Sequence, residues 1–468
     1  MLLLSPGSSF MAEKSHSPGE KQGAGDVSPA SISRTDFQKV GLISCAALVA
    51  ANMIGTGVFT SLGFQVAALP SAFLIMLLWA LGGVIAFCGA LCYAELAAAL
   101  PRSGGEYNFL GRCFHPAIGF MAGFVSVAIG FSAPIALASI ASGRYMAAAF
   151  PGLNPILASV TVVLALTVLH SLTVKASGTL QVIVTCLKVG MIILFISVGF
   201  LAGNKAGAIF TPTSQDVPLF FSHSFAVALM FVLYSYTGWN AAAYIISEVR
   251  SPQRTLPAAL LISTSFVALL YVGMNMVFLR AAPMETYVGK IAVAEIAARN
   301  IFGDVGGRVM AGIIGAGLIS TLSAMTWAGP RVAQTVGKDF RALRWLSHTT
   351  AGGVPRRSLF LQTGLVLIFL LSSTYEVVLI YAQFALATCA FLTVAGVIVL
   401  RIREPHLPRP FRCWGYPVTP IVFLLLTGFT MLYSLIEKPW EAGAGALTLL
   451  LGLGLYFIAS RPGLKTNP

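Results

Sequence analysis

The sequence contains few charged residues for its length. Only 10% of its 468 residues are Asp, Glu, Lys or Arg, whereas about a quarter of a typical soluble domain is charged. A soluble chain of this length would need a charged shell around two or three domains, and so few charges cannot supply one. Together with the 57% of hydrophobic residues, this shortage all but excludes a soluble enzyme.

Common catalytic and metal-binding motifs are also missing. The seven cysteines form no CxxC pair and accompany no histidine cluster, so neither a zinc site nor a thioredoxin-like motif is indicated. There is no Walker loop, no HExxH motif and no EF-hand loop. We therefore expect a protein that is not an enzyme and that uses no metal and no cofactor.

In place of these motifs, the sequence has a series of long apolar runs. From Phe37 onward, each run is long enough to cross a hydrocarbon layer, which needs about 20 helical residues. Continuous runs favour helices over the shorter, alternating strands of a membrane barrel. We read twelve spans, of which the ninth is short. They lie at roughly 38–63, 71–99, 117–147, 155–173, 180–202, 222–247, 256–280, 307–334, 359–374, 377–401, 418–436 and 442–460.

The net charge of +13 is explained by topology better than by nucleic-acid binding. With an internal N-terminus, 21 Lys and Arg residues fall on the internal side and seven on the external side, and Lys188 remains inside a span. Basic loops are retained in the cytoplasm, so we expect both termini there, in a plasma membrane or bacterial inner membrane. Residues 1–36, rich in Ser, Gly, Pro and charge, are expected to be a disordered cytoplasmic tail.

Two spans that lie five apart are interrupted by glycine, in Gly55-Thr56-Gly57 and in Tyr236-Thr237-Gly238. Transporters built from inverted repeats place discontinuous helices at such corresponding positions, with the substrate near the midplane. If unwound, the first segment presents N–H groups to an anion such as a carboxylate, and the second frees carbonyls for an ammonium group. The alternatives are a small-residue packing face for the first segment and an aromatic-rich core for the second.

Three charged residues are further candidates. Lys188 lies near the middle of the fifth span, where a cation is costly and is therefore a functional candidate by default. The alternative is a lysine that snorkels to the interface, although a depth of about 12 Å is large for its stem. Glu95 and Glu248 lie near cytoplasmic helix ends beside Arg102, Arg250 and Arg254, where they form an inner gate or simply anchor the helices.

Six segments carry recognisable signatures: Gly55-Thr56-Gly57-Val-Phe59, Tyr93-Ala-Glu95-Leu with Pro101-Arg-Ser-Gly104-Gly105-Glu106-Tyr107, Gly238-Trp239-Asn240, Glu248-Val-Arg-Ser-Pro252, Gly329-Pro330-Arg331 and Arg403-Glu404-Pro405. Together they resemble the amino acid–polyamine–organocation permeases, and within them the L-type amino acid transporter branch. The resemblance covers nearly all of the chain after the tail. It implies an all-α membrane protein with twelve transmembrane helices and the LeuT-like fold. A first five-helix repeat would span residues 37–203 and an inverted second repeat residues 204–401, followed by two additional helices and a cytoplasmic C-terminus over 402–468.

The resemblance also implies roles for single residues. Backbone N–H groups of Gly55, Thr56 and Gly57 would bind the α-carboxylate of an amino acid. Carbonyls of Tyr236 and Thr237, freed by Gly238, would take its α-amino group. Tyr234 and Trp239 would gate the pocket. Lys188 would point at the broken first helix in place of a sodium ion, which makes the proton a candidate coupling ion. Hydroxyls of Ser320 and Ser323 on the eighth span would help to hold an ion or would only pack.

The combined expectation is a secondary active transporter of neutral L-amino acids that works by alternating access, as a proton-coupled symporter or an exchanger. Neutral substrates are favoured because the cores of the first, third, sixth, eighth and tenth spans contain no acidic residue and no Arg. The alternatives are a cationic amino acid or polyamine antiporter of the same fold, and a channel or membrane receptor, for which no filter motif is present. We expect a monomer in the lipid bilayer, with no nucleic acid. The external loop Phe150–Pro155 has no cysteine, so no disulfide-linked heavy chain is expected.

Overall fold

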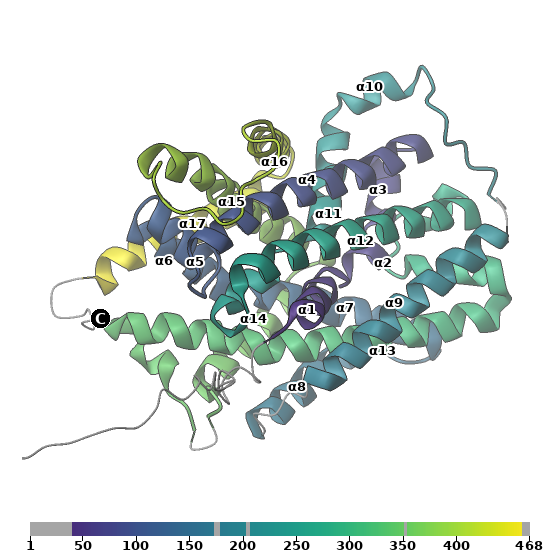
Figure 1. Cartoon of the computed structure of the whole chain (residues 1–468). Helices are drawn as coiled ribbons and strands as arrows, with labels where there is room; N and C mark the ends of the chain where they lie inside the picture. The colour runs from purple at the N-terminus through teal and green to yellow at the C-terminus, as the bar shows by residue number, and fades with distance from the viewer. Residues whose placement is uncertain (1–39, 173–177, 203–205, 351–352, 461–468) are drawn as a thin grey trace, which may run out of the picture. The chain divides into compact units, whose positions relative to one another are not determined.

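Helices make up most of the chain that the structure describes. A computed structural model describes residues 40–172, 178–202, 206–350 and 353–460 (Figure 1). Within these ranges the only β-structure is an isolated parallel bridge between Val40 and Val249. Helices satisfy their own backbone hydrogen bonds, as the interior of a bilayer requires. The prediction of an all-α membrane protein is confirmed, whereas the expected tail, residues 1–36, lies outside the described residues.

Eleven helical segments of the described chain are long and apolar enough to cross a membrane. The expected count of twelve is not confirmed, because the ninth expected span is a helix of only 17 residues, α14. The helices are α1 (Leu42–Met53), α2 (Gly57–Thr60), α3 (Leu62–Ala68), α4 (Ala72–Ala99), α5 (Glu106–Cys113), α6 (Pro116–Val125), η2 (Ser126–Gly130), α7 (Ser132–Ala149), α8 (Pro155–Leu172), α9 (Gly178–Leu201), α10 (Asp216–Phe220), α11 (His223–Tyr236), η3 (Ala241–Glu248), α12 (Pro252–Ala281), η4 (Met284–Tyr287), α13 (Val293–Asp339), η5 (Arg341–Ser347), α14 (Arg356–Ser372), α15 (Tyr375–Arg403), α16 (Val418–Glu437) and α17 (Pro439–Ala459).

The long helices pack in pairs. α4 lies along α12, α7 packs against α13, and α15 packs against both α16 and α17 (Figure 1). Small residues permit the closest approaches: a Cβ at Gly143 of α7 would lie 2.2 Å from the carbonyl oxygen of Pro155 in α8. Close backbone packing at glycine is a usual way for helices to associate in a membrane, where apolar burial alone gives no preference.

Both glycine-containing spans are interrupted where the sequence predicted. α1 ends at Met53 and α2 begins at Gly57, so the first span loses its helical hydrogen bonds for one turn. α11 ends at Tyr236, and the chain turns through residues 237–240 into the 3-10 helix η3. Gly238 adopts a φ of 98°, a conformation that glycine accepts without the strain imposed by a Cβ.

Candidate functional site

The two breaks pack against each other backbone to backbone. A Cβ added at Gly57 would lie 2.4 Å from the Cα of Ser235, and one added at Gly238 would lie 2.7 Å from the carbonyl of Asn52. Gly55, in contrast, has space around it, because the atom nearest to an added Cβ would lie 3.9 Å away. The glycines at 57 and 238 therefore allow the broken helices to meet.

Unused backbone groups of opposite polarity come together at this contact. In the described chain, no backbone hydrogen bond uses the N–H groups of Thr56 and Gly57 or the carbonyls of Tyr236 and Thr237. Gly55 differs from the prediction, because its N–H donates to the Met53 carbonyl at 2.7 Å. Free N–H groups at the start of a half-helix suit an anion, and free carbonyls suit a cation. The arrangement matches the two charged groups on the α-carbon of an amino acid.

Both breaks border one cavity of about 560 Å³, a volume typical of small-molecule sites. It is lined by the predicted substrate-binding and gate residues from the two breaks. Further lining residues come from the third, eighth, tenth and eleventh expected spans. The set includes Asn52, Gly55, Thr56, Gly57, Ser126, Phe131, Tyr234, Tyr236, Thr237, Gly238, Trp239, Asn240, Thr321, Met325, Arg331, Gln383 and Thr427.

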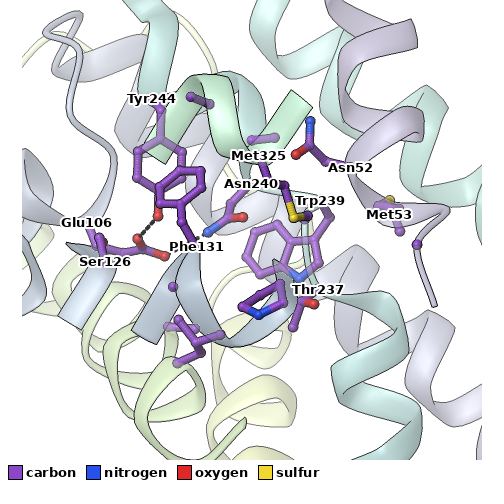
Figure 2. A pocket seen from close by; sticks show the side chains of 18 of the residues that line it. Asn52, Met53, Glu106, Ser126, Phe131, Thr237, Trp239, Asn240, Tyr244 and Met325 are labelled. Atoms are coloured by element: carbon purple, nitrogen blue, oxygen red, sulfur yellow. Dashed lines mark hydrogen bonds between the residues drawn. The ribbon is translucent and has the colours of Figure 1, made fainter. Parts of the chain in front are cut away.

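The aromatic side chains at the break in the sixth span take different positions. Tyr236 lines the cavity but donates its hydroxyl to the Trp79 carbonyl at 2.9 Å, so its ring belongs to the packing around α4. Trp239 borders the cavity (Figure 2) and packs edge-on against Tyr93 at 4.6 Å and Phe423 at 6.4 Å. Trp239, one of the two predicted gate residues, is therefore held between two other rings.

A carboxylate that the sequence did not predict as a site residue also lines the cavity. Glu106, at the start of α5, is 6% exposed and accepts hydrogen bonds from Tyr93 at 2.8 Å and Asn240 at 2.7 Å. Its second oxygen accepts from Tyr244, as Figure 2 shows. Three donors from α4 and the second half of the sixth span therefore surround one buried carboxyl group.

A stack of three aromatic rings lies beside the break in the first span. Phe64 stacks on Phe231 at 5.3 Å and on Tyr375 at 5.6 Å between ring centroids. The Tyr375 hydroxyl bonds to Thr60 at 2.7 Å and donates to Thr56 at 3.3 Å, so the stack contacts the break in the first span directly. Tyr375 was not among the predicted site residues.

One part of the cavity wall is made of exposed residues. Ser247 and Glu248 are exposed and line it together with Ser103 and Arg331. The Arg331 guanidinium lies 3.6 Å above the Trp327 ring. Beside this part of the wall, Tyr107 donates to Asp339 at 2.7 Å; burial and the Asp339 carboxylate raise the pKa of Tyr107, so it remains a donor. The cavity therefore opens where the sequence predicts cytoplasmic loops.

Lys188 lies behind the cavity wall rather than in it. It is 9% exposed, and its Nζ donates to Thr321 Oγ1 at 2.5 Å. Thr321, on α13, does line the cavity, and α9 also contacts α1. No ion pair of Lys188 is found in the part of the chain that the structure describes. One hydroxyl thus separates the buried ammonium group from the cavity.

Three other predicted residues lie away from the cavity. Ser323 hydrogen-bonds to His170 at 2.9 Å on α8, and Ser320 does not line the cavity. The sequence places Glu95 near a helix end beside Arg102, but Glu95 pairs with other arginines. It forms a 2.5 Å ion pair with Arg401 and a 3.4 Å one with Arg409, because α15 and the segment after it fold back onto the end of α4.

The expectation that the pocket is free of acidic residues and Arg needs correction. It rested on span cores, and Glu106, Glu248 and Arg331 enter the cavity wall from span ends and from the short helix α5. Glu106 belongs to the Ser103-Gly-Gly-Glu106-Tyr107 segment already singled out for its sequence signature. That signature was the available signal, but its place outside an apolar run gave no reason to put it in a membrane cavity.

An all-helical membrane chain with two discontinuous helices at one cavity has the architecture of a secondary transporter. Comparison with known proteins agrees: residues 40–446 match the family model for amino acid permeases. The chain belongs to the amino acid permease family and is a membrane transporter rather than an enzyme.

Several curated relatives align over most of the chain. Asc-type amino acid transporter 1 of Mus musculus is 28% identical over 90% of this chain and 81% of its own length. The b(0,+)-type amino acid transporter 1 of Mus musculus is 26% identical over 91% of this chain and 89% of its own. Large neutral amino acids transporter small subunit 2 of Mus musculus is 27% identical, with 90% and 81% covered.

Proposed function

We propose that this permease carries neutral L-amino acids by alternating access, as an exchanger or a proton-coupled symporter. The observation that carries the proposal is the meeting of free N–H groups at Thr56 and Gly57 with free carbonyls at Tyr236 and Thr237 beside one cavity. The names of the relatives, an Asc-type transporter and a large neutral amino acids transporter subunit among them, support the same class of substrate.

In this proposal the α-carboxylate binds at the break in the first span, and the α-amino group binds at the break in the sixth span. The side chain then extends into the rest of the cavity, toward α15 and α16. Binding both charged groups through backbone atoms leaves the substrate's side chain to be selected by the cavity wall. The stacked rings of Phe64, Phe231 and Tyr375 form the external closure, and the exposed end near Glu248 is the cytoplasmic exit.

The carboxylates in the wall do not favour a cationic side chain. Both oxygens of Glu106 already accept hydrogen bonds from Tyr93, Asn240 and Tyr244, so a cationic substrate would have to displace these donors. Glu248 lies at the exposed end of the cavity, where water solvates its carboxylate. We therefore place cationic amino acid and polyamine antiport second.

The test is uptake by proteoliposomes that contain the purified full chain. Labelled neutral amino acids, arginine and a polyamine are supplied with and without a proton gradient and with and without preloaded amino acid. We expect saturable uptake of a neutral amino acid. Uptake only into preloaded vesicles identifies an exchanger, and stimulation by the gradient identifies a symporter. Transport restricted to arginine or the polyamine would overturn the assignment.

We further propose that Glu248 and Arg331 attract each other when the cytoplasmic end closes. Both residues line that end of the cavity, from η3 and α13. Arg331→Ala should slow exchange by about fivefold, the effect of losing roughly 1 kcal/mol of ion-pair attraction. The double swap Glu248→Arg with Arg331→Glu should recover part of the rate.

The matched control for this gate is the exposed pair Arg112–Glu404, with its nitrogen and oxygen 2.5 Å apart and away from the cavity. Arg112→Ala should leave exchange unchanged. A rate in Arg331→Ala equal to that of Arg112→Ala would rule out the gate role.

The remaining proposals concern organisation. Residues 37–203 and 204–401 would form inverted repeats, because the breaks fall in the first and sixth spans. Both termini would be cytoplasmic. The chain would work as a monomer without a disulfide-linked heavy chain: six of its seven cysteines are buried, and the exposed Cys186 lies in the expected fifth span rather than in an external loop. A single band on a non-reducing gel of native membranes is expected.

A further inference from the structure

Two polar side chains on the cavity wall lack the hydrogen bonds that their burial demands. Eight buried side-chain nitrogen or oxygen atoms of the described residues have no hydrogen-bond partner, and of these only Gln383 Oε1 and Thr427 Oγ1 belong to residues that line the cavity. Gln383 is 5% exposed and Thr427 is 2% exposed. An unpaired buried polar group is costly, so a partner is expected to arrive from within the cavity.

The surfaces that carry these two residues are otherwise apolar. α15 contributes Gln383, Leu386, Ala387 and Ala390 to the cavity, at the spacing of one helix face. α16 contributes Phe423 and Thr427, one turn apart. An apolar wall with a few polar groups is the usual form of a site that fixes one part of a ligand.

Both residues lie on helices that contact the two breaks and line the same cavity as the breaks. Tyr375, at the start of α15, donates to Thr56 of the first break, and Gln383 follows eight residues later, about 12 Å along the helix axis. Phe423 packs against the ring of Trp239, at the break in the sixth span. Thr427 follows Phe423 by one turn of α16, a helix that also packs against α11, whose last residue precedes the break in the sixth span.

We propose that Gln383 and Thr427 form a side-chain subsite, which selects neutral amino acids with a hydroxyl or carboxamide group over apolar amino acids of the same shape. This inference rests on the proposed function, because it requires the α-carbon groups to be held at the breaks. The glutamine amide and the threonine hydroxyl each both donate and accept. They therefore suit an uncharged polar group better than a charged one.

The test compares isosteric substrates in proteoliposomes of the full chain, by kcat/KM for threonine against valine and for asparagine against leucine. The wild type should prefer threonine by at least about tenfold, because valine would leave the buried groups unpaired. Gln383→Met and Thr427→Val should each reduce the preference severalfold, and the double variant should remove it while valine uptake persists.

The controls separate the subsite from folding and from the proposed function. Thr388→Val lies on the same helix, with its hydroxyl bonded to the Phe384 carbonyl at 2.8 Å and outside the cavity wall, and should keep the preference. Gln383→Asn, which keeps the amide, should keep more of it than Gln383→Met. Equal transport of threonine and valine by the wild type overturns the subsite and leaves the proposed function standing. So does an unchanged preference in the double variant. Absence of uptake for every amino acid overturns both.

Discussion

Replacing Gly57 or Gly238 with alanine is expected to abolish transport. The Gly57 Cβ would lie 2.4 Å from the Ser235 Cα, and the Gly238 Cβ 2.7 Å from the Asn52 carbonyl. Both neighbours are backbone atoms, so a rotamer change cannot relieve the clash, and the broken helices must separate. Overpacking of this kind costs about 1–3 kcal/mol, which corresponds to a loss of up to roughly 100-fold in uptake. Initial uptake rates of purified variants in proteoliposomes measure the effect.

Gly454→Ala is the matched control. Gly454 lies in α17 with no atom within 4 Å of the position of its Cβ, so the same substitution should leave uptake unchanged. Membrane insertion of all three variants is checked by size-exclusion chromatography after solubilisation. Near-normal uptake by Gly57→Ala would mean that the breaks need not touch during transport.

Replacing Lys188 with alanine is expected to abolish transport or to uncouple it without preventing membrane insertion. The lysine is buried and donates to Thr321, which lines the cavity. A hydrogen bond from a charged group contributes about 1.5–3 kcal/mol, so its loss should lower uptake by roughly 10- to 100-fold. Thr321→Val should reproduce part of this loss, because it removes the only hydroxyl between the ammonium group and the cavity that the described contacts show.

Lys290→Ala removes an exposed lysine after η4 and serves as the control. The measurement is uptake at several pH values and with imposed proton gradients. If Lys188→Ala transports at the wild-type rate with an unchanged pH dependence, the lysine has no part in coupling.

The spans and both helix breaks could be predicted from the sequence, because each depends on local composition. An apolar run of about 20 residues has few alternatives to a transmembrane helix, and glycine within such a run weakens the helix locally. The structure places the break between Met53 and Gly57 and that after Tyr236 within the predicted segments. The ninth span was the marginal case because its apolar run is short.

The side-chain partners could not be predicted in the same way. Glu95 meets Arg401, 306 residues further along the chain, and this pairing depends on how the last helices fold back. On the eighth span Lys188 bonds to Thr321, whereas the sequence singled out Ser320 and Ser323 as candidate ion-site hydroxyls. Successive residues of a helix point about 100° apart, so a small error in helix rotation selects the wrong hydroxyl. Glu106 was missed because it lies in a short helix between spans.

The measurement that tests the account most directly is a structure of the full chain with a bound neutral amino acid. We predict density for the ligand in the cavity, with its carboxylate within hydrogen-bond distance of the Thr56 and Gly57 N–H groups. Its amino group should lie against the carbonyls of Tyr236 and Thr237. An amino acid bound elsewhere in the cavity, with these four backbone groups unoccupied, would contradict the account.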